Sequence, residues 1–176
     1  QDQFRERETG KTYLALVKGA WPVKRKVLDK PLHKYLLPDG ERRVKVVAKD
    51  DPDGMPSLTL VKVRACTDAP AAAPTDPTGG VSLLEVTIKT GRTHQIRVHL
   101  ASEGHPIVGD DKYGDFELNK LLARGDAKAP VLKRMFLHAW RLQCAHPVTG
   151  KGMVLQAPLP SELAGFLRQV LPQATV

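Results

Sequence analysis

Cysteines, aromatic side chains and long apolar runs are all scarce in this sequence. Two cysteines, Cys66 and Cys144, are too few for a disulfide framework in 176 residues, which predicts reduced thiols and a cytoplasmic protein. No apolar run approaches the ~18 residues that a membrane-spanning helix needs. Aromatic residues make up 5% of the chain, so a stacking surface for single-stranded nucleic acid is weakly supported.

The start of the sequence lacks the features of a secretory signal. Residues 1–8 (QDQFRERE) carry mixed charges and no apolar segment, which excludes a signal peptide. The first residue is glutamine and not methionine, so we expect the chain to be part of a longer protein.

Positive charge is unevenly distributed in an otherwise ordinary globular composition. The chain has 27 lysines and arginines against 19 aspartates and glutamates, a net charge of +8. Ten of the basic residues lie within residues 18–49, namely Lys18, Lys24, Arg25, Lys26, Lys30, Lys34, Arg42, Arg43, Lys45 and Lys49. The same region holds three acids, Asp29, Asp39 and Glu41. This excess favours a nucleic acid partner, because neutralised phosphates release counterions; a basic surface that only aids solubility is the alternative.

Apolar periodicity predicts one domain over residues 1–176, built from strands and a closing helix. Strands are expected at residues 11–17, 58–65, 81–89, 135–144 and 152–157. Residues 66–80, rich in proline and alanine, are expected to form a flexible loop insertion between two antiparallel strands. The closing helix is expected to start at Ser161 as its N-cap and to bury Leu163, Phe166, Leu167 and Val170.

Residues 90–100 (TGRTHQIRVHL) carry the densest chemistry, and their periodicity fits both a strand and a helix. A helix is favoured, because Thr93 suits an N-cap and Gly104 stands where a glycine ends a helix. Arg97 then lies on the apolar stripe and needs a desolvated anionic partner, unless it reaches water or pairs with a carboxylate only to fix packing. No carboxylate of the sequence is an obvious partner by its spacing.

Two other chemistries have little support. His94, His99 and His105 are five and six residues apart, which does not bring them together on one helix, and no cysteine or aspartate completes a metal site. Ser102 beside His99 or His105 lacks the Gly-x-Ser-x-Gly turn of a hydrolase. We therefore predict neither a metal site nor a serine hydrolase.

Three groups of residues, in order along the chain, resemble the RluA-type pseudouridine synthases. The longest joins residues 91–99 (GRTHQIRVH) to residues 104–114 (GHPIVGDDKYG). Residues 11–19 (KTYLALVKG) resemble an earlier motif of that family, and FLHA at residues 136–139 with HPVTG at residues 146–150 resembles a late one. The basic region is most similar to the subgroup that acts on large-subunit ribosomal RNA.

The resemblance implies an enzyme that isomerises uridine within RNA, ribosomal RNA above all, without a metal or organic cofactor. It implies an α/β (α+β) fold with a mainly antiparallel mixed sheet and flanking helices. In this family a tyrosine stacks on the uracil and a basic residue pairs with a catalytic aspartate, roles that fall on Tyr13 and Arg97. Leu137 is expected to line the pocket, and Arg92 to hold RNA backbone. Histidines 94, 99, 105 and 138 are expected to be scaffolding.

The sequence departs from the family pattern in one motif. The family's aspartate lies in His-Arg-Leu-Asp-x-x-Thr-Ser-Gly, upstream of the tyrosine, and this stretch does not occur here. Asp29 in VLDK is downstream and does not match it. We therefore expect a partial catalytic domain without an S4 domain and without the N-terminal part of the fold, inactive as an isolated chain. A non-catalytic RNA-binding module on the same scaffold is the alternative.

Overall fold

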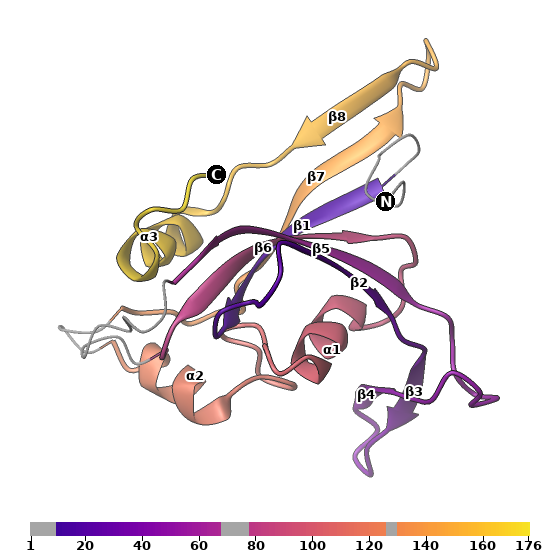
Figure 1. The fold of residues 1–176 in the computed structure, drawn as a ribbon, viewed down its shortest axis with the longest axis horizontal. Coiled ribbons are helices and arrows are strands. Elements are labelled where there is room, and N and C mark those ends of the chain that lie inside the picture. Colours follow the sequence, from indigo (N-terminus) through magenta and orange to yellow (C-terminus); the bar gives the residue numbers. More distant parts are fainter. Residues whose placement is uncertain (1–9, 68–77, 126–129) are drawn as a thin grey trace.

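A six-stranded antiparallel sheet forms the centre of the molecule in the computed structural model, which describes residues 10–67, 78–125 and 130–176. Its strands run in the order β2 (Arg25–Asp29), β5 (Leu58–Cys66), β6 (Val81–Ile88), β1 (Gly10–Lys18), β7 (Leu137–Ala145) and β8 (Gly152–Gln156) (Figure 1). Each neighbouring pair is antiparallel. The five strands expected from the sequence are confirmed, and so is the pairing across the loop insertion, most of which lies outside the described residues.

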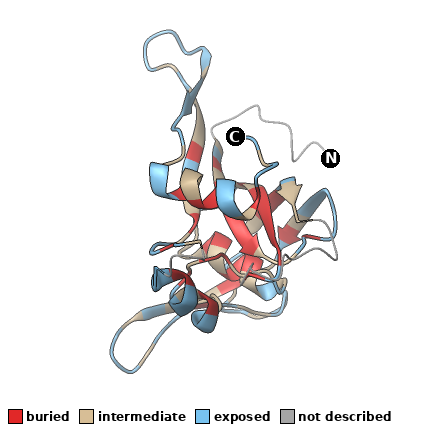
Figure 2. Cartoon of the chain, turned by 90° about the vertical axis from the view of Figure 1, so that its left-hand side faces the viewer, coloured by how far each residue is buried: buried red, intermediate tan, exposed pale blue. Residues whose placement is uncertain are grey.

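Strand β1 is buried on both faces, because its side chains alternate between two apolar clusters. Leu14 and Leu16 belong to the cluster that also contains Leu163, Phe166 and Leu167. That cluster lies under helix α3 (Ser161–Val170) and also receives side chains from helix α2 (Phe116–Ala123). Figure 2 shows the buried residues gathered on the strands and on the inner sides of the helices.

The opposite face of β1 packs against helix α1 (Gln95–Ser102). Ala15 and Val17 join Ile96 and Leu100 of that helix in the second cluster. In Figure 1, α1 and α3 lie on opposite sides of the sheet. The expected sheet with flanking helices is therefore confirmed, and a helix, not a strand, carries Arg97.

The predicted helix caps were wrong in two of three cases. Helix α1 is capped by His94 in a left-handed conformation, not by Thr93. Helix α3 begins at Ser161 as predicted, but Pro160 and not Ser161 occupies its N-cap position. Gly104 does follow the end of α1, at a φ of +82°. Of the four expected core residues of α3, three are buried and Val170 is partly buried.

A separate two-stranded hairpin, β3 (Leu32–Leu36) and β4 (Arg42–Val46), was not predicted from the sequence. It projects away from the sheet beside α1 (Figure 1). Leu32 and Val44 pack on Val98 of α1 in a third small apolar cluster, bordered by Tyr113. The hairpin therefore contacts the helix that carries Arg97 and carries part of the basic region.

Candidate functional site

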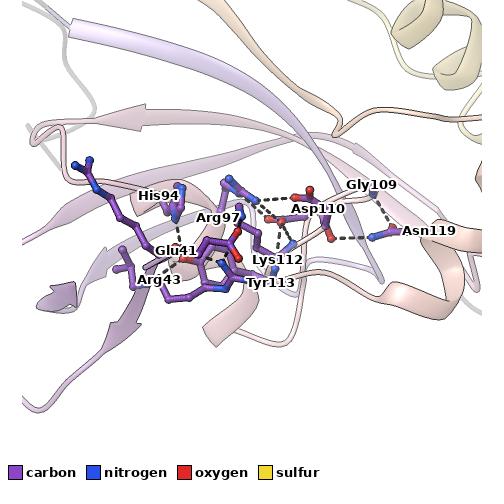
Figure 3. A network of polar contacts seen from close by, with 12 residues as sticks. Glu41, Arg43, His94, Arg97, Gly109, Asp110, Lys112, Tyr113 and Asn119 are labelled. Carbon is purple, nitrogen blue, oxygen red and sulfur yellow. Dashed lines mark hydrogen bonds and ion pairs between the residues drawn. The ribbon is translucent and has the colours of Figure 1, made fainter. Parts of the chain in front are cut away.

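Arg97 and Asp110 form the central ion pair of the candidate site (Figure 3). The Nε of Arg97 donates to Oδ2 of Asp110 at 3.0 Å, and its Nη2 donates to Oδ1 at 2.6 Å. The Asp110 side chain is fully buried, and that of Arg97 is 12% exposed. Two hydrogen bonds between charged groups at this depth hold the guanidinium in one plane.

The carboxylate of Asp110 is fixed by the turn on which it lies. Oδ1 also accepts hydrogen bonds from the backbone N–H groups of Lys112 and Tyr113, at 2.9 and 3.1 Å. Asn119 of α2 links both sides of this turn: its amide donates to the carbonyl of Asp110, and its oxygen accepts from the N–H of Gly109. Asp110 is therefore oriented by its own backbone and by the next helix, independently of Arg97.

Close packing explains two glycines of the same turn. A Cβ atom on Gly109 would collide with the backbone carbonyl of Arg134, and one on Gly114 with that of Asp110. Gly109 also has a φ of +85°, a conformation in which a side chain is strained. Both features indicate a turn whose shape is tightly constrained.

Tyr113 covers the guanidinium of Arg97 and connects it to the hairpin. Its ring centre lies 5.3 Å from the Arg97 Cζ. Its hydroxyl oxygen accepts a hydrogen bond from the backbone N–H of Val44 at 2.9 Å and lies 2.7 Å from Nδ1 of His94, toward which the hydroxyl proton can point. His94 has a φ of 54°, so this contact fixes a strained residue at the start of α1.

The charges of the pair stabilise each other. Burial would lower the pKa of the Arg97 guanidinium, but the hydrogen bond with Asp110 and the negative charges of Asp110 and Asp111 together outweigh burial and raise that pKa. Burial would raise the pKa of the Asp110 carboxyl, but the hydrogen bonds from Arg97 and from the backbone of Lys112 and Tyr113 lower it. Both groups are therefore charged at neutral pH. Burial, with the positive charge of Arg97, lowers the pKa of His94, which favours a neutral ring.

The structure corrects one expectation about Arg97. The side chain does turn inward, but a carboxylate of this chain, 13 residues downstream, pairs with it. Helical or strand spacing does not reveal Asp110, because the turn after α1 brings it back to the helix. The sequence signal was the GDDKYG stretch, whose first aspartate is the buried one.

Tyr13 and Leu137 are brought to the same face of the sheet as α1. Both are partly buried against the cluster that contains Ile96 and Leu100. Tyr13 also borders an open hollow of about 350 Å³ on β1, β7 and β8. Arg97 and Leu137 are not among the described residues that line this hollow, and within the described residues no hydrogen bond or ring contact joins Arg97 to Tyr13.

Arg92 makes a structural contact in this chain. Its Nε donates to the carbonyl of Pro56 at 3.1 Å, and its backbone N–H donates to the side chain of Gln95. The guanidinium therefore joins the start of α1 to the segment before β5. Its expected contact with RNA backbone stays a prediction.

The four histidines bond to separate parts of the scaffold. His99 is fully buried between Thr59 and the carbonyl of Lys30, and burial lowers its pKa. His105 and His138 bond to the carbonyls of Lys18 and Ala157, and His94 bonds to Tyr113 as described above. The three histidines considered as metal ligands therefore point to three different partners.

Other chemistries find no support in the described ranges. The hydroxyl of Ser102 donates to the backbone carbonyl of His99, so it is not paired with an imidazole base. Within residues 10–67, 78–125 and 130–176, no group of three or more His, Cys, Asp or Glu side chains is arranged to hold a metal ion. In the same ranges, no helix has the length and apolar character needed to cross a bilayer.

A protein-family model matches more than half of this chain. The model of a family described as RNA pseudouridylate synthase matches residues 1–102, which include both Tyr13 and Arg97. Ribosomal large subunit pseudouridine synthase C of Salmonella typhimurium is 40% identical over 173 residues, and the protein of the same name from Escherichia coli K12 is 38% identical over 169 residues. The matches cover 98% and 96% of this chain but 48% and 47% of those relatives. The chain thus spans about half the length of these curated relatives.

Two solved human structures share the fold. Human RNA Pseudouridylate Synthase Domain Containing 1 superposes with a TM-score of 0.63 at 28% identity, covering 93% of this chain and 60% of that one. Domain Containing 4 superposes with a TM-score of 0.65 at 23% identity, covering 97% of this chain and 65% of that one. The second likeness bears on the fold alone.

Proposed function

Because this chain belongs to the RNA pseudouridylate synthase family, we propose that the full protein isomerises uridine to pseudouridine in RNA. The observation that carries this proposal is the family match over residues 1–102, which holds both side chains expected at the reacting base. The chain is similar to RluA-type enzymes, and relatives named for the ribosomal large subunit make 23S ribosomal RNA the proposed substrate. A cytoplasmic location agrees with that substrate.

The proposed reaction moves one bond of the base. The N1–C1′ bond breaks, the uracil turns, and a C5–C1′ bond forms; C5 then loses its proton and N1 gains one, so that the product is an isomer. The uridine must leave its stack for the enzyme to reach C1′ and both faces of the base. Tyr13 is proposed to stack on the uracil and Leu137 to line its pocket.

Arg97 is proposed to pair with the catalytic aspartate. We assign that aspartate to none of the residues in this sequence and place it in the remainder of the full protein, since about half of each curated relative lies outside the match. On this proposal the chain is one part of a catalytic domain, and alone it forms no pseudouridine.

RNA binding is proposed to use the hairpin and the adjoining edge of the sheet. Lys34, Arg42 and Lys45 are exposed on β3 and β4, and Arg25 and Lys26 on β2. Cations on an exposed hairpin can follow phosphates without a specific base contact. A non-catalytic RNA-binding protein on the same scaffold would use the same surface, so RNA binding alone does not separate the two functions.

Release of tritium from RNA labelled at C5 of uridine tests the proposed function, because C5 loses its hydrogen when it joins C1′. The full protein is incubated with 23S ribosomal RNA, and the product nucleosides are separated by reversed-phase chromatography, because pseudouridine and uridine have the same mass. We expect wild-type protein to release tritium and form pseudouridine, and Tyr13→Ala and Arg97→Ala to lower the rate at least about 100-fold. RNA binding by the wild type without any tritium release would favour the non-catalytic alternative.

A further inference from the structure

We propose that Asp110 is a positioning residue, which holds Arg97 by its Nε and Nη2 edge so that Nη1 is left to meet a second anionic oxygen. In the proposed function, on which this inference rests, that oxygen belongs to the catalytic aspartate. Asp110 itself acts only through Arg97.

The guanidinium is held from one side. Nε and Nη2 both donate to Asp110, and Nη2 also lies 3.3 Å from Oδ1 of Asp111. Among the described residues, Nη1 has no hydrogen-bond partner. A guanidinium has five N–H donors, so this arrangement occupies one edge and leaves the donors of Nη1 for another acceptor.

Asp110, and not Asp111, has the properties of a positioning group. The side chain of Asp110 is fully buried, whereas that of Asp111 is 85% exposed. Asp110 is held by two backbone N–H groups and by the link to Asn119, so it has one orientation before Arg97 is considered. A catalytic group supported by such a second layer keeps its geometry within a fraction of an ångström.

Tyr113 restricts the guanidinium in the remaining direction. Its ring lies against Arg97, and its hydroxyl contacts His94 (Figure 3). The same hydroxyl accepts a hydrogen bond from the backbone N–H of Val44. Rotation of the Arg97 side chain would break two charged hydrogen bonds and displace this ring. The exposed part of Arg97 therefore points in a fixed direction. This favours the reaction, because the entropy of orienting the guanidinium is already lost before the transition state is reached.

Hydrogen exchange at the Nε–H of Arg97, followed by NMR on the full protein, tests the positioning without any need for activity. Asp110→Asn keeps the volume and the backbone hydrogen bonds but loses the charge and one acceptor. We expect it to speed exchange at least about tenfold. Asp115→Asn is the matched control. The carboxylate of Asp115 lies in the same loop, where it caps α2 and pairs with Lys18. Its removal should leave the exchange at Arg97 unchanged. Equal exchange in wild type and Asp110→Asn would overturn the proposal.

Steady-state kinetics then tests whether the position matters for the reaction. We expect Asp110→Asn to lower kcat about 100-fold with KM within about threefold of wild type, because a small displacement of Arg97 affects the transition state more than RNA binding. Asp115→Asn should lower thermal stability and leave kcat, measured well below the unfolding temperature, within about threefold. If Asp110→Asn does not fold, Asp110→Glu, which keeps the charge but shifts the guanidinium, should show the same loss of kcat.

A double-mutant cycle with Arg97→Lys separates a positioning role from a general structural one. If Asp110 acts through Arg97, Asp110→Asn should change kcat by less than about threefold in the Arg97→Lys background. The full 100-fold loss in that background would overturn the proposal. If wild-type protein forms no pseudouridine, the proposed function fails, and the exchange measurement still decides whether Asp110 holds Arg97.

Discussion

The hydroxyl group of Tyr113 accepts a hydrogen bond from the backbone N–H of Val44, which fastens the β3–β4 hairpin to the turn that contains Asp110. The same ring lies against Arg97. A second link, the ion pair of Lys112 with Glu41, joins the same turn to the start of β4. The basic hairpin therefore contacts the candidate site directly, through the short turn that contains Asp110, Lys112 and Tyr113.

Loss of the Tyr113 hydroxyl should weaken this connection. In Tyr113→Phe the buried N–H of Val44 loses its partner, and we expect a loss of about 1–3 kcal/mol in the free energy of unfolding, measured by urea denaturation. Tyr35→Phe, on the exposed strand β3, is the control and should change stability by less than about 0.5 kcal/mol. Equal stability of the two variants would contradict the role given to Tyr113.

A pair of glycines separates steric collision from backbone strain. Gly109 and Gly40 have nearly the same φ, +85° and +86°, but only at Gly109 would an added Cβ meet the backbone of Arg134. We expect Gly40→Ala to cost about 1–2 kcal/mol, from the left-handed conformation alone. Gly109→Ala should cost about 1–3 kcal/mol more, because the collision adds to the strain. Thermal unfolding of both variants measures the difference, and similar midpoints would refute the steric argument.

Stability should fall in mildly acidic solution because of His99. Its ring is buried, burial lowers its pKa, and the unfolded chain therefore binds this proton more readily than the folded one. The stability that neutral His99 contributes is complete above its ordinary pKa of about 6.5 and declines as the pH falls below that value. Urea denaturation from pH 7.5 to 5 should show this decline, and His99→Gln should make it shallower; the remaining decline is expected from His94, whose pKa is also lowered by burial. An unchanged slope in the variant would rule out this residue as the cause.

RNA affinity should depend on the exposed lysines of the hairpin. Lys34→Ala and Lys45→Ala should each weaken binding and reduce the slope of log affinity against log salt concentration by about 1, as expected for one phosphate contact. Lys120→Ala, an exposed lysine on α2, is the control for a general loss of charge. Titration of labelled RNA at several salt concentrations measures the slopes, and identical slopes for all three variants would place the RNA elsewhere.

The sequence predicts the sheet better than it predicts the basic region. Strand β1 and the strand pairs that followed were found because their apolar residues alternate along enough positions to fill two clusters. Strands β2 to β4 were missed because five-residue strands rich in lysine and arginine, interrupted by Pro-Asp-Gly turns, bury only one side chain each. Helix α2 was also missed, although Asp115 caps it as a typical N-cap residue does.

In the candidate site, the sequence predicts the orientation of Arg97 but not its partner. Helical spacing placed Arg97 on the inner side of α1, and the structure agrees. Its partner was not predictable by spacing, because Asp110 reaches the helix through an irregular turn shaped by Gly109 and Asn119. A buried arginine was expected to have an anionic partner, and the structure shows that Asp110 is this partner.

The contacts of the arginine are local in the chain. One continuous segment, residues 94–119, contains Arg97, Asp110, Tyr113 and Asn119. Transfer of this segment to a related protein would therefore transfer the guanidinium with its counter-ion and the ring that covers it. The hairpin attaches to this stretch through one backbone amide and a few side chains. A replacement hairpin that keeps a backbone N–H at the position of Val44 should therefore leave the orientation of Arg97 unchanged, because the groups that fix the guanidinium come from outside the hairpin.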